Sequence, residues 1–212
     1  MKLLSVNIAR PRSVTFDGRT YATGIDKSAL AGPVWLGVLN LAGDGQGDLK
    51  NHGGQYQAVY CYPHEHYAYW RERLSRDEFA FGQFGENFTT LGLLERDVCI
   101  GDTLRISGAL IQVTQPRVPC YKLANKLGIP GFDKTFLQAN RSGFYAQVLE
   151  EGEVAAGDPI ERLSRDPVGM SVAEVNAALL LDKEPTAIQR ALRLTALSPE
   201  WRARFEKLLT RA

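Results

Sequence analysis

Short segments in which apolar and polar residues alternate dominate the first three quarters of the chain. Alternation with a period of two is typical of a strand that buries one face. We therefore expect strands at residues 3–8, 34–40, 57–62, 98–106, 109–115 and 144–150. Turns rich in glycine and proline separate them. Many short strands with few long helices predict a mainly β, α+β fold: a barrel or folded sheet with two or three added helices.

A helical period interrupts this pattern after Pro63. Tyr67, Trp70 and Leu74 recur at a spacing that places them on one helix face, so we expect a helix over residues 63–76 with Pro63 as its first residue. A second, shorter helix is expected with Pro119 as its first residue and Gly128 ending it.

Only helical patterns follow residue 168. Ser171 and Glu174 form a capping-box pattern, Pro185 opens a second segment, and Ser198 precedes a third. We therefore predict a main β domain at residues 1–163 and a three-helix domain at residues 168–212. A bundle this small has little core of its own, so we expect it to pack on the main domain or on a second subunit in a homodimer.

Composition narrows the class of protein. The chain has 212 residues, a net charge of +1 and three cysteines. This charge argues against a general nucleic-acid or membrane-surface binder. No apolar stretch approaches the length that spans a bilayer, and the first residues lack the features of a signal peptide. Few cysteines fit a reducing compartment, so we expect a cytoplasmic protein without disulfides or a membrane partner.

The most informative stretch is Gln-Pro-Arg-Val-Pro-Cys-Tyr-Lys-Leu at residues 115–123. It places Cys120 in the first turn of the expected second helix, between Arg117 and Lys122. A helix start and flanking cations both favour the thiolate at neutral pH. A thiolate in this setting is either a nucleophile or a soft metal ligand.

Glycine-rich and polar clusters precede this motif at residues 23–27, 43–54 and 84–90. Glycine turns allow backbone N–H groups, such as that of Gly53, to approach a ligand closely. The side chains of Asn51, His52 and Asn87 add directional hydrogen bonds. These residues are therefore candidates for ligand binding.

The motif at residues 115–123 resembles the signature of the MOSC domain. Four further elements occur in the order that this family uses: Asp48 with His52-Gly53-Gly54, then residues 84–88, then residues 100–102, and finally residues 143–152 followed by Gly157-Asp158. The resemblance covers about residues 3–162, and the tail resembles the small terminal domain of YiiM-like members. We therefore expect this chain to lack the extra N-terminal β-domain that longer family members carry.

This resemblance implies a mixed β-barrel that binds the molybdenum cofactor, a pterin dithiolene that carries the metal. It implies that Cys120 ligates molybdenum and that the protein reduces N-hydroxylated compounds, including hydroxylaminopurine bases and amidoximes. Arg117, Lys122 and Lys27 are then candidates for the pterin phosphate, and His52 for a catalytic proton donor. The chain carries no flavin, haem or iron–sulfur motif, so electrons are expected from a separate flavin or iron–sulfur protein.

Other interpretations stay open. The chain is alternatively a cofactor carrier or sulfur-transfer module without turnover, or a metal-free thiol enzyme with Cys120 as nucleophile and His52 as base. Cys120 is alternatively a buried small hydrophobe, His52 a turn cap and Arg117 a structural ion-pair partner.

Overall fold

A computed structural model describes residues 1–48 and 53–210 of the chain. Within them, eight strands form one sheet in the order β12-β8-β9-β10-β6-β7-β1-β4, mostly antiparallel, with β6 and β7 parallel. The strands of this sheet are β1 (Lys2–Ile8), β4 (Ser28–Ala29), β6 (Val59–Pro63), β7 (Phe88–Leu91), β8 (Thr103–Ile106), β9 (Ala109–Pro116), β10 (Phe144–Glu150) and β12 (Ile160–Ser164). Two smaller pairs are β2 (Arg12–Phe16) with β3 (Arg19–Thr23), and β5 (Val34–Leu36) with β11 (Gly152–Val154).

The large sheet curls until its two ends approach each other. The start of β1 bonds to the segment just before β12, through an isolated bridge between Lys2 and Pro159 and a 2.9 Å bond from Leu3 N to Asp158 O. The described residues form no continuous ladder that closes the ring. The result is a strongly curved, barrel-like sheet.

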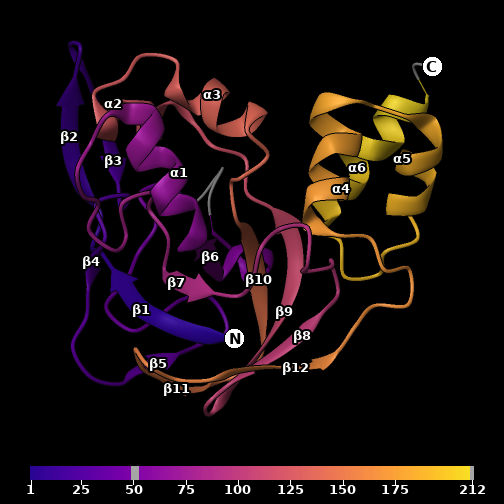
Figure 1. Ribbon diagram of the computed structural model, residues 1–212, viewed down its shortest axis with the longest axis horizontal. Coiled ribbons are helices and arrows are strands. Elements are labelled where there is room, and N and C mark those ends of the chain that lie inside the picture. Colours follow the sequence, from indigo (N-terminus) through magenta and orange to yellow (C-terminus); the bar gives the residue numbers. More distant parts are fainter. Residues whose placement is uncertain (49–52, 211–212) are drawn as a thin grey trace.

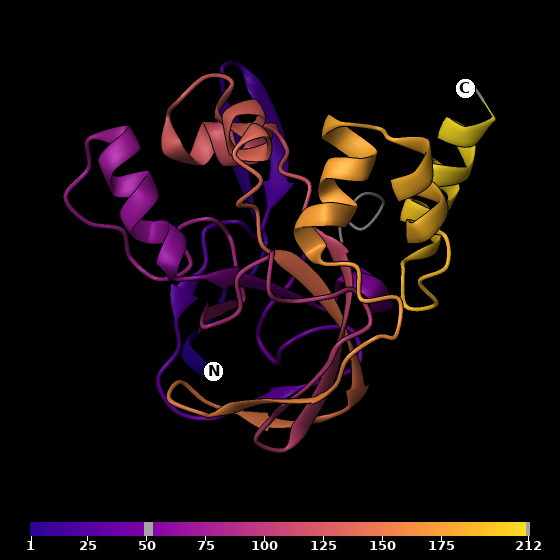
Figure 2. The same ribbon diagram turned by 45° about the vertical axis from the view of Figure 1, so that its right-hand side comes forward.

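The helices lie at one end of this sheet (Figures 1 and 2). In the first domain they are the 3₁₀ turn η1 (Gln55–Gln57), α1 (Glu65–Leu74), α2 (Tyr121–Leu127) and α3 (Phe132–Gln138). The C-terminal bundle consists of α4 (Val172–Asn176), which continues as the π-helical turn η2 (Ala177–Leu181), then α5 (Pro185–Ala191) and α6 (Pro199–Leu209). Ser171 and Glu174 form the predicted capping box, and Pro185 lies in the first turn of α5.

Backbone hydrogen bonds join the bundle to the sheet domain where the bundle begins. Ile100 N donates to Met170 O at 3.1 Å, and Val172 N donates to Val98 O at 2.8 Å. A single apolar core runs from the inside of the sheet into the bundle, where it includes Trp201. The bundle therefore packs on its own main domain.

A second core, rich in aromatic rings, fills the space beneath α1, α2 and α3. Trp70, Phe84 and Phe136 are fully buried there, and Trp70 and Phe136 stack with ring centroids 5.1 Å apart. This core supports the segment that leads from β9 into α2.

The predicted fold class, mainly β with a helical tail, is confirmed. Two predicted strands are too long. The segment at residues 34–40 leaves its strand after Leu36, because Gly37 and Asn40 close a turn. The segment at residues 98–106 is extended only from Thr103, because the Asp102 side chain accepts a hydrogen bond from Cys99 N and holds a turn.

Candidate functional site

The pocket around Cys120

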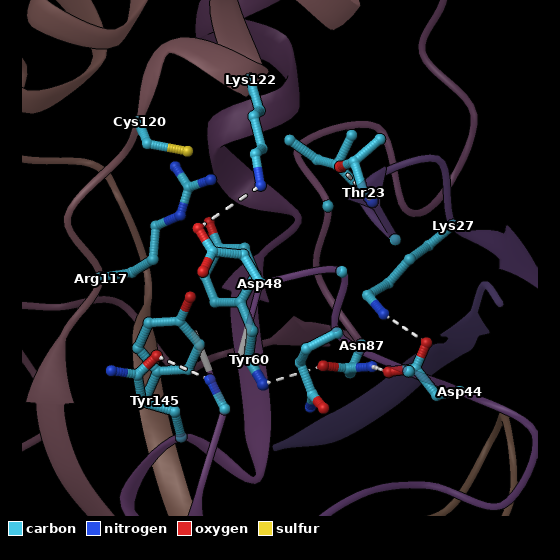
Figure 3. Close-up of a pocket in the computed structure, with 18 residues that line it drawn as sticks. Thr23, Lys27, Asp44, Asp48, Tyr60, Asn87, Arg117, Cys120, Lys122 and Tyr145 are labelled. Carbon is cyan, nitrogen blue, oxygen red and sulfur yellow. Dashed lines mark hydrogen bonds and ion pairs between the residues drawn. The ribbon is translucent and has the colours of Figure 1, made fainter. Parts of the chain in front are cut away.

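Six of the predicted site residues line one pocket: Lys27, Gly53, Asn87, Arg117, Cys120 and Lys122 (Figure 3). The pocket encloses about 640 Å³ of space, counted out to its open mouth. The predicted residues Asn51 and His52 lie outside the described residues.

Cys120 lies at the end of an extended segment that leads into α2. It has φ −124° and ψ 170° and occupies the N-cap position, and its carbonyl accepts a hydrogen bond from Leu123 N at 2.9 Å. The prediction that Pro119 opens the helix is wrong, because the first helical residue is Tyr121. The side chain is partly exposed and lines the pocket. A helix of seven residues has only a small dipole, so charge for a thiolate has to come mainly from nearby side chains.

Arg117 supplies that charge. Its side chain is 5% exposed, with the guanidinium carbon 5.1 Å from the centre of the Tyr60 ring and 5.6 Å from that of Phe136. Figure 3 shows the Cys120 sulfur close to this guanidinium. Burial alone would lower the pKa of Arg117, but Tyr60, Tyr145 and Cys120 outweigh burial and raise it. The cation therefore persists at any physiological pH.

One guanidinium nitrogen of Arg117, Nη1, is buried and has no hydrogen-bond partner among the described residues. A buried charged donor without a partner is costly. The pocket therefore offers a fixed, unsatisfied positive group beside a sulfur atom, which is a setting for an anionic ligand.

Lys122 and Lys27 are placed in the pocket but already have partners. Lys122 Nζ donates to Ala22 O at 3.1 Å and lies 3.8 Å from the Asp48 carboxylate. Lys27 is buried and lies 2.5 Å from Asp44. Burial lowers the pKa of Lys27, and Asp44 offsets this effect only in part. Both lysines are consequently weaker candidates for a ligand phosphate than Arg117.

Asn87 belongs to a network that holds the pocket floor together. Its amide nitrogen donates to Asp44 at 2.8 Å and to Asn7 O at 3.3 Å, and its amide oxygen accepts from Tyr60 N at 3.2 Å. These bonds use the polar atoms that a ligand would need. The geometry favours a structural role for Asn87.

Glycines in the pocket wall allow two loops to touch through their backbones. A Cβ on Gly24 would lie 2.3 Å from Gly45 O, and one on Gly47 would lie 2.5 Å from the Ala22 carbonyl carbon. Any side chain at these positions would force the loops apart. The glycine run thus shapes the pocket wall, while Gly53 N, at the pocket edge, donates to Gln57 at 3.4 Å.

Tyr145 is a site residue that the sequence reasoning missed. It follows Phe144 in a strand that alternates in burial, its side chain hydrogen-bonds to Arg117, and it lines the pocket. Burial and Cys120 raise the pKa of its hydroxyl although Arg117 acts in the opposite direction. The hydroxyl therefore stays protonated at neutral pH and is able to donate a hydrogen bond.

The other two cysteines, Cys61 and Cys99, are buried in the protein interior. Burial raises the pKa of both thiols. Within residues 1–48 and 53–210, no cluster of three or more His, Cys, Asp or Glu side chains could hold a metal ion. In the same ranges, no helix combines the length and apolar character needed to cross a bilayer.

Comparison with known proteins

The MOSC domain family matches residues 48–161, and the YiiM-like 3-alpha helix domain matches residues 170–212. The chain belongs to the MOSC family. Its second match makes it a YiiM-like MOSC protein, as the resemblance in the sequence predicted. The MOSC match contains Arg117, Cys120 and Lys122, whereas the Lys27 side of the pocket lies before it.

Similarity to individual relatives supports the same assignment. This MOSC protein is 47% identical to YflK of Bacillus subtilis over 97% of the chain and 93% of that protein. The crystal structure of YiiM from Geobacillus stearothermophilus is 37% identical and superimposes with a TM-score of 0.83 over 98% of each chain. A Gibberella moniliformis protein named reductase is 31% identical over 84% of this chain, which spans 32% of that protein.

Proposed function

We propose that this MOSC protein is a molybdenum cofactor-dependent reductase of N-hydroxylated compounds. The reaction is R–NHOH + 2 e⁻ + 2 H⁺ → R–NH₂ + H₂O, with the electrons supplied by a separate flavin or iron–sulfur protein. The observation that carries the proposal is the buried guanidinium of Arg117, which has one unsatisfied nitrogen and lies beside the Cys120 sulfur in one pocket. The fungal relative named reductase supports the reaction class.

The residues present fit this cofactor. The cofactor is anionic and its metal prefers sulfur ligands, and the pocket offers one thiol and one unsatisfied buried cation. A dithiolene brings its own sulfur atoms, so it needs no cluster of protein ligands around the metal. When bound, the group supplies the two-electron chemistry that cleaves the N–O bond.

The chain itself has three tasks in this function. Cys120 would hold the metal through its sulfur, and Arg117 would neutralise the negative charge of the cofactor beside it. Lys122, fixed by Ala22 O and Asp48, would add a second positive group at the same wall. His52 remains our predicted proton donor, and the Tyr145 hydroxyl is a second candidate donor, at the pocket.

The test is to purify the full chain from a host that makes molybdopterin and to measure molybdenum and pterin per chain. Cys120→Ala should lose the metal, while Cys99→Ala, the matched control in a buried cysteine outside the pocket, should keep it. A chemical reductant with benzamidoxime should then give turnover in proportion to the metal content.

Each alternative has its own outcome. Bound cofactor without turnover would identify a carrier or sulfur-transfer module. Full activity in metal-free protein that disappears with Cys120→Ala would identify a thiol enzyme. Equal metal content in wild type and Cys120→Ala would overturn the role of Cys120 as ligand.

A further inference from the structure

A second pocket adjoins the first at Cys120 and lies between the segment at residues 118–122 and helix α6 of the bundle. It encloses about 930 Å³ of space, counted to its open mouth. Cys120 and Tyr145 line both pockets. A ligand in the first pocket and a small molecule in the second would therefore meet at the Cys120 sulfur.

Gln115 gives this second pocket a built polar site. Its side chain is 4% exposed, it lines the pocket, and its Oε1 atom is buried with no hydrogen-bond partner in the described part of the chain. A buried acceptor of this kind is satisfied by a donor on an incoming molecule. We therefore expect a molecule bound here to donate a hydrogen bond to Gln115 Oε1 from an N–H or O–H group.

The charges that line the second pocket are paired. Glu200 and Arg204 form an ion pair at 2.6 Å on successive turns of α6, and Lys122 faces Asp48 at 3.8 Å. The two acidic and two basic side chains balance. By contrast, the first pocket contains the unsatisfied cation of Arg117. The second pocket therefore suits an uncharged molecule, and the first an anion.

The remaining lining mixes polar and apolar side chains. Pro119 and Trp201 are buried, Val118 and Tyr145 are partly buried, and Gln57 adds a further polar group. A small molecule that carries both polar and apolar groups therefore suits this pocket.

We infer that this second pocket is the substrate chamber of the proposed reductase, and that it takes an uncharged N-hydroxylated molecule whose N–H or O–H group donates to Gln115. The inference rests on the proposed function for the reaction, but it assigns the binding site independently of turnover. It also assigns a role in substrate binding to the helical bundle, because Glu200 and Arg204 of α6 line the second pocket.

The first test measures binding without cofactor. Ligand-observed NMR on the cofactor-free full chain should detect benzamidoxime, and Gln115→Met should weaken its affinity about three- to tenfold, the range of one neutral hydrogen bond. Gln147→Met is the matched control, because Gln147 pairs with Gln112 and lines neither pocket. An unchanged affinity in Gln115→Met, or no binding in wild type, would overturn the inference.

A second test does not depend on the folding of the Gln115 variant. Glu200→Lys reverses a charge at the exposed rim, so it should raise the affinity for 4-carboxybenzamidoxime relative to benzamidoxime about fivefold. Glu206→Lys makes the same change on an exposed residue of α6 that does not line the pocket, and should leave the ratio unchanged. Equal ratios in both variants would refute the placement of the chamber.

The two proposals fail separately. Suppose that the cofactor-free protein binds benzamidoxime through Gln115 but the molybdenum-loaded protein does not turn it over. The proposed reaction is then wrong, whereas the assignment of the second pocket as a binding site is supported. If the loaded protein reduces benzamidoxime with the same KM in wild type, Gln115→Met and Glu200→Lys, the reaction stands and the chamber lies elsewhere.

Discussion

Replacing Arg117 by methionine should separate its role in binding from any role in folding. Methionine keeps most of the volume of the side chain and removes the guanidinium. In the cofactor-free protein, the change removes a buried donor that has no partner among the described residues. Its loss removes a desolvation penalty of about 1–3 kcal/mol from the folded state. It also removes contacts with the Tyr60 and Phe136 rings, each about 0.5–2 kcal/mol, and a bond to Tyr145 of about 1 kcal/mol.

These contributions oppose each other: at the middle of each range about 3.5 kcal/mol is lost and about 2 kcal/mol is recovered, so the free energy of unfolding should fall by about 1.5 kcal/mol. Removing one partner of a satisfied buried ion pair would instead cost about 3–5 kcal/mol. Cofactor affinity should fall by about 1.5–3 kcal/mol, or about 10- to 150-fold, because a charge-assisted hydrogen bond is lost. Urea unfolding of the cofactor-free protein measures the first quantity, and titration with the isolated pterin cofactor measures the second.

Lys122→Met is the control for this comparison. Its ammonium already bonds to Ala22 O and faces Asp48, so its loss should destabilise the fold more and weaken the cofactor less than loss of Arg117. If Arg117→Met lowers the free energy of unfolding by more than about 3 kcal/mol while cofactor affinity stays constant, Arg117 is a structural cation and the argument for an anionic ligand is wrong.

Three further changes test other parts of the structure. Burial pushes the pKa of Glu174 upward, but its hydrogen bonds at the helix cap outweigh this and lower it, so Glu174→Gln should be less stable than wild type above about pH 5. In urea titrations the two proteins should converge as the pH falls through the folded pKa; a constant difference would contradict the assignment. Gly47→Ala should distort the pocket wall and reduce cofactor affinity, because its Cβ would lie 2.5 Å from the Ala22 backbone; Gly108→Ala, with no contact under 3.4 Å, should leave the affinity unchanged. Phe136→Ala should lower the free energy of unfolding by about 3–5 kcal/mol, and a loss below 1 kcal/mol would show that the aromatic core relaxes around the gap.

Strands with one buried face could be predicted from the sequence, whereas exposed strands could not. The strand Phe144–Glu150 alternates in burial and was placed correctly at both ends. The hairpin of β2 and β3 was missed because most of its residues are exposed and carry no hydrophobic pattern. Its turn did contain a signal: Asp17 and Gly18 both have positive φ, as an Asp-Gly hairpin turn requires.

The position of Cys120 at a helix start could be predicted, but the pairing of the charges around it could not. Lys27 and Asp44 lie 17 residues apart, and only the fold brings them within 2.5 Å. The same holds for Gln115 and Trp201, which both line the second pocket although one lies in the middle of the sequence and the other near its end. Local patterns report which residues are available, whereas long-range packing decides which of them keep an unsatisfied atom.

The hydrogen bonds between residues 98–100 and residues 170–172 tie the bundle to the sheet at the same place where their apolar cores merge. Neither part can lose its structure without exposing the interior of the other. The two sequence domains should therefore melt as one cooperative unit, with a single heat-absorption peak on calorimetry. A cut between them would yield two fragments that aggregate instead of a working core and a dispensable tail.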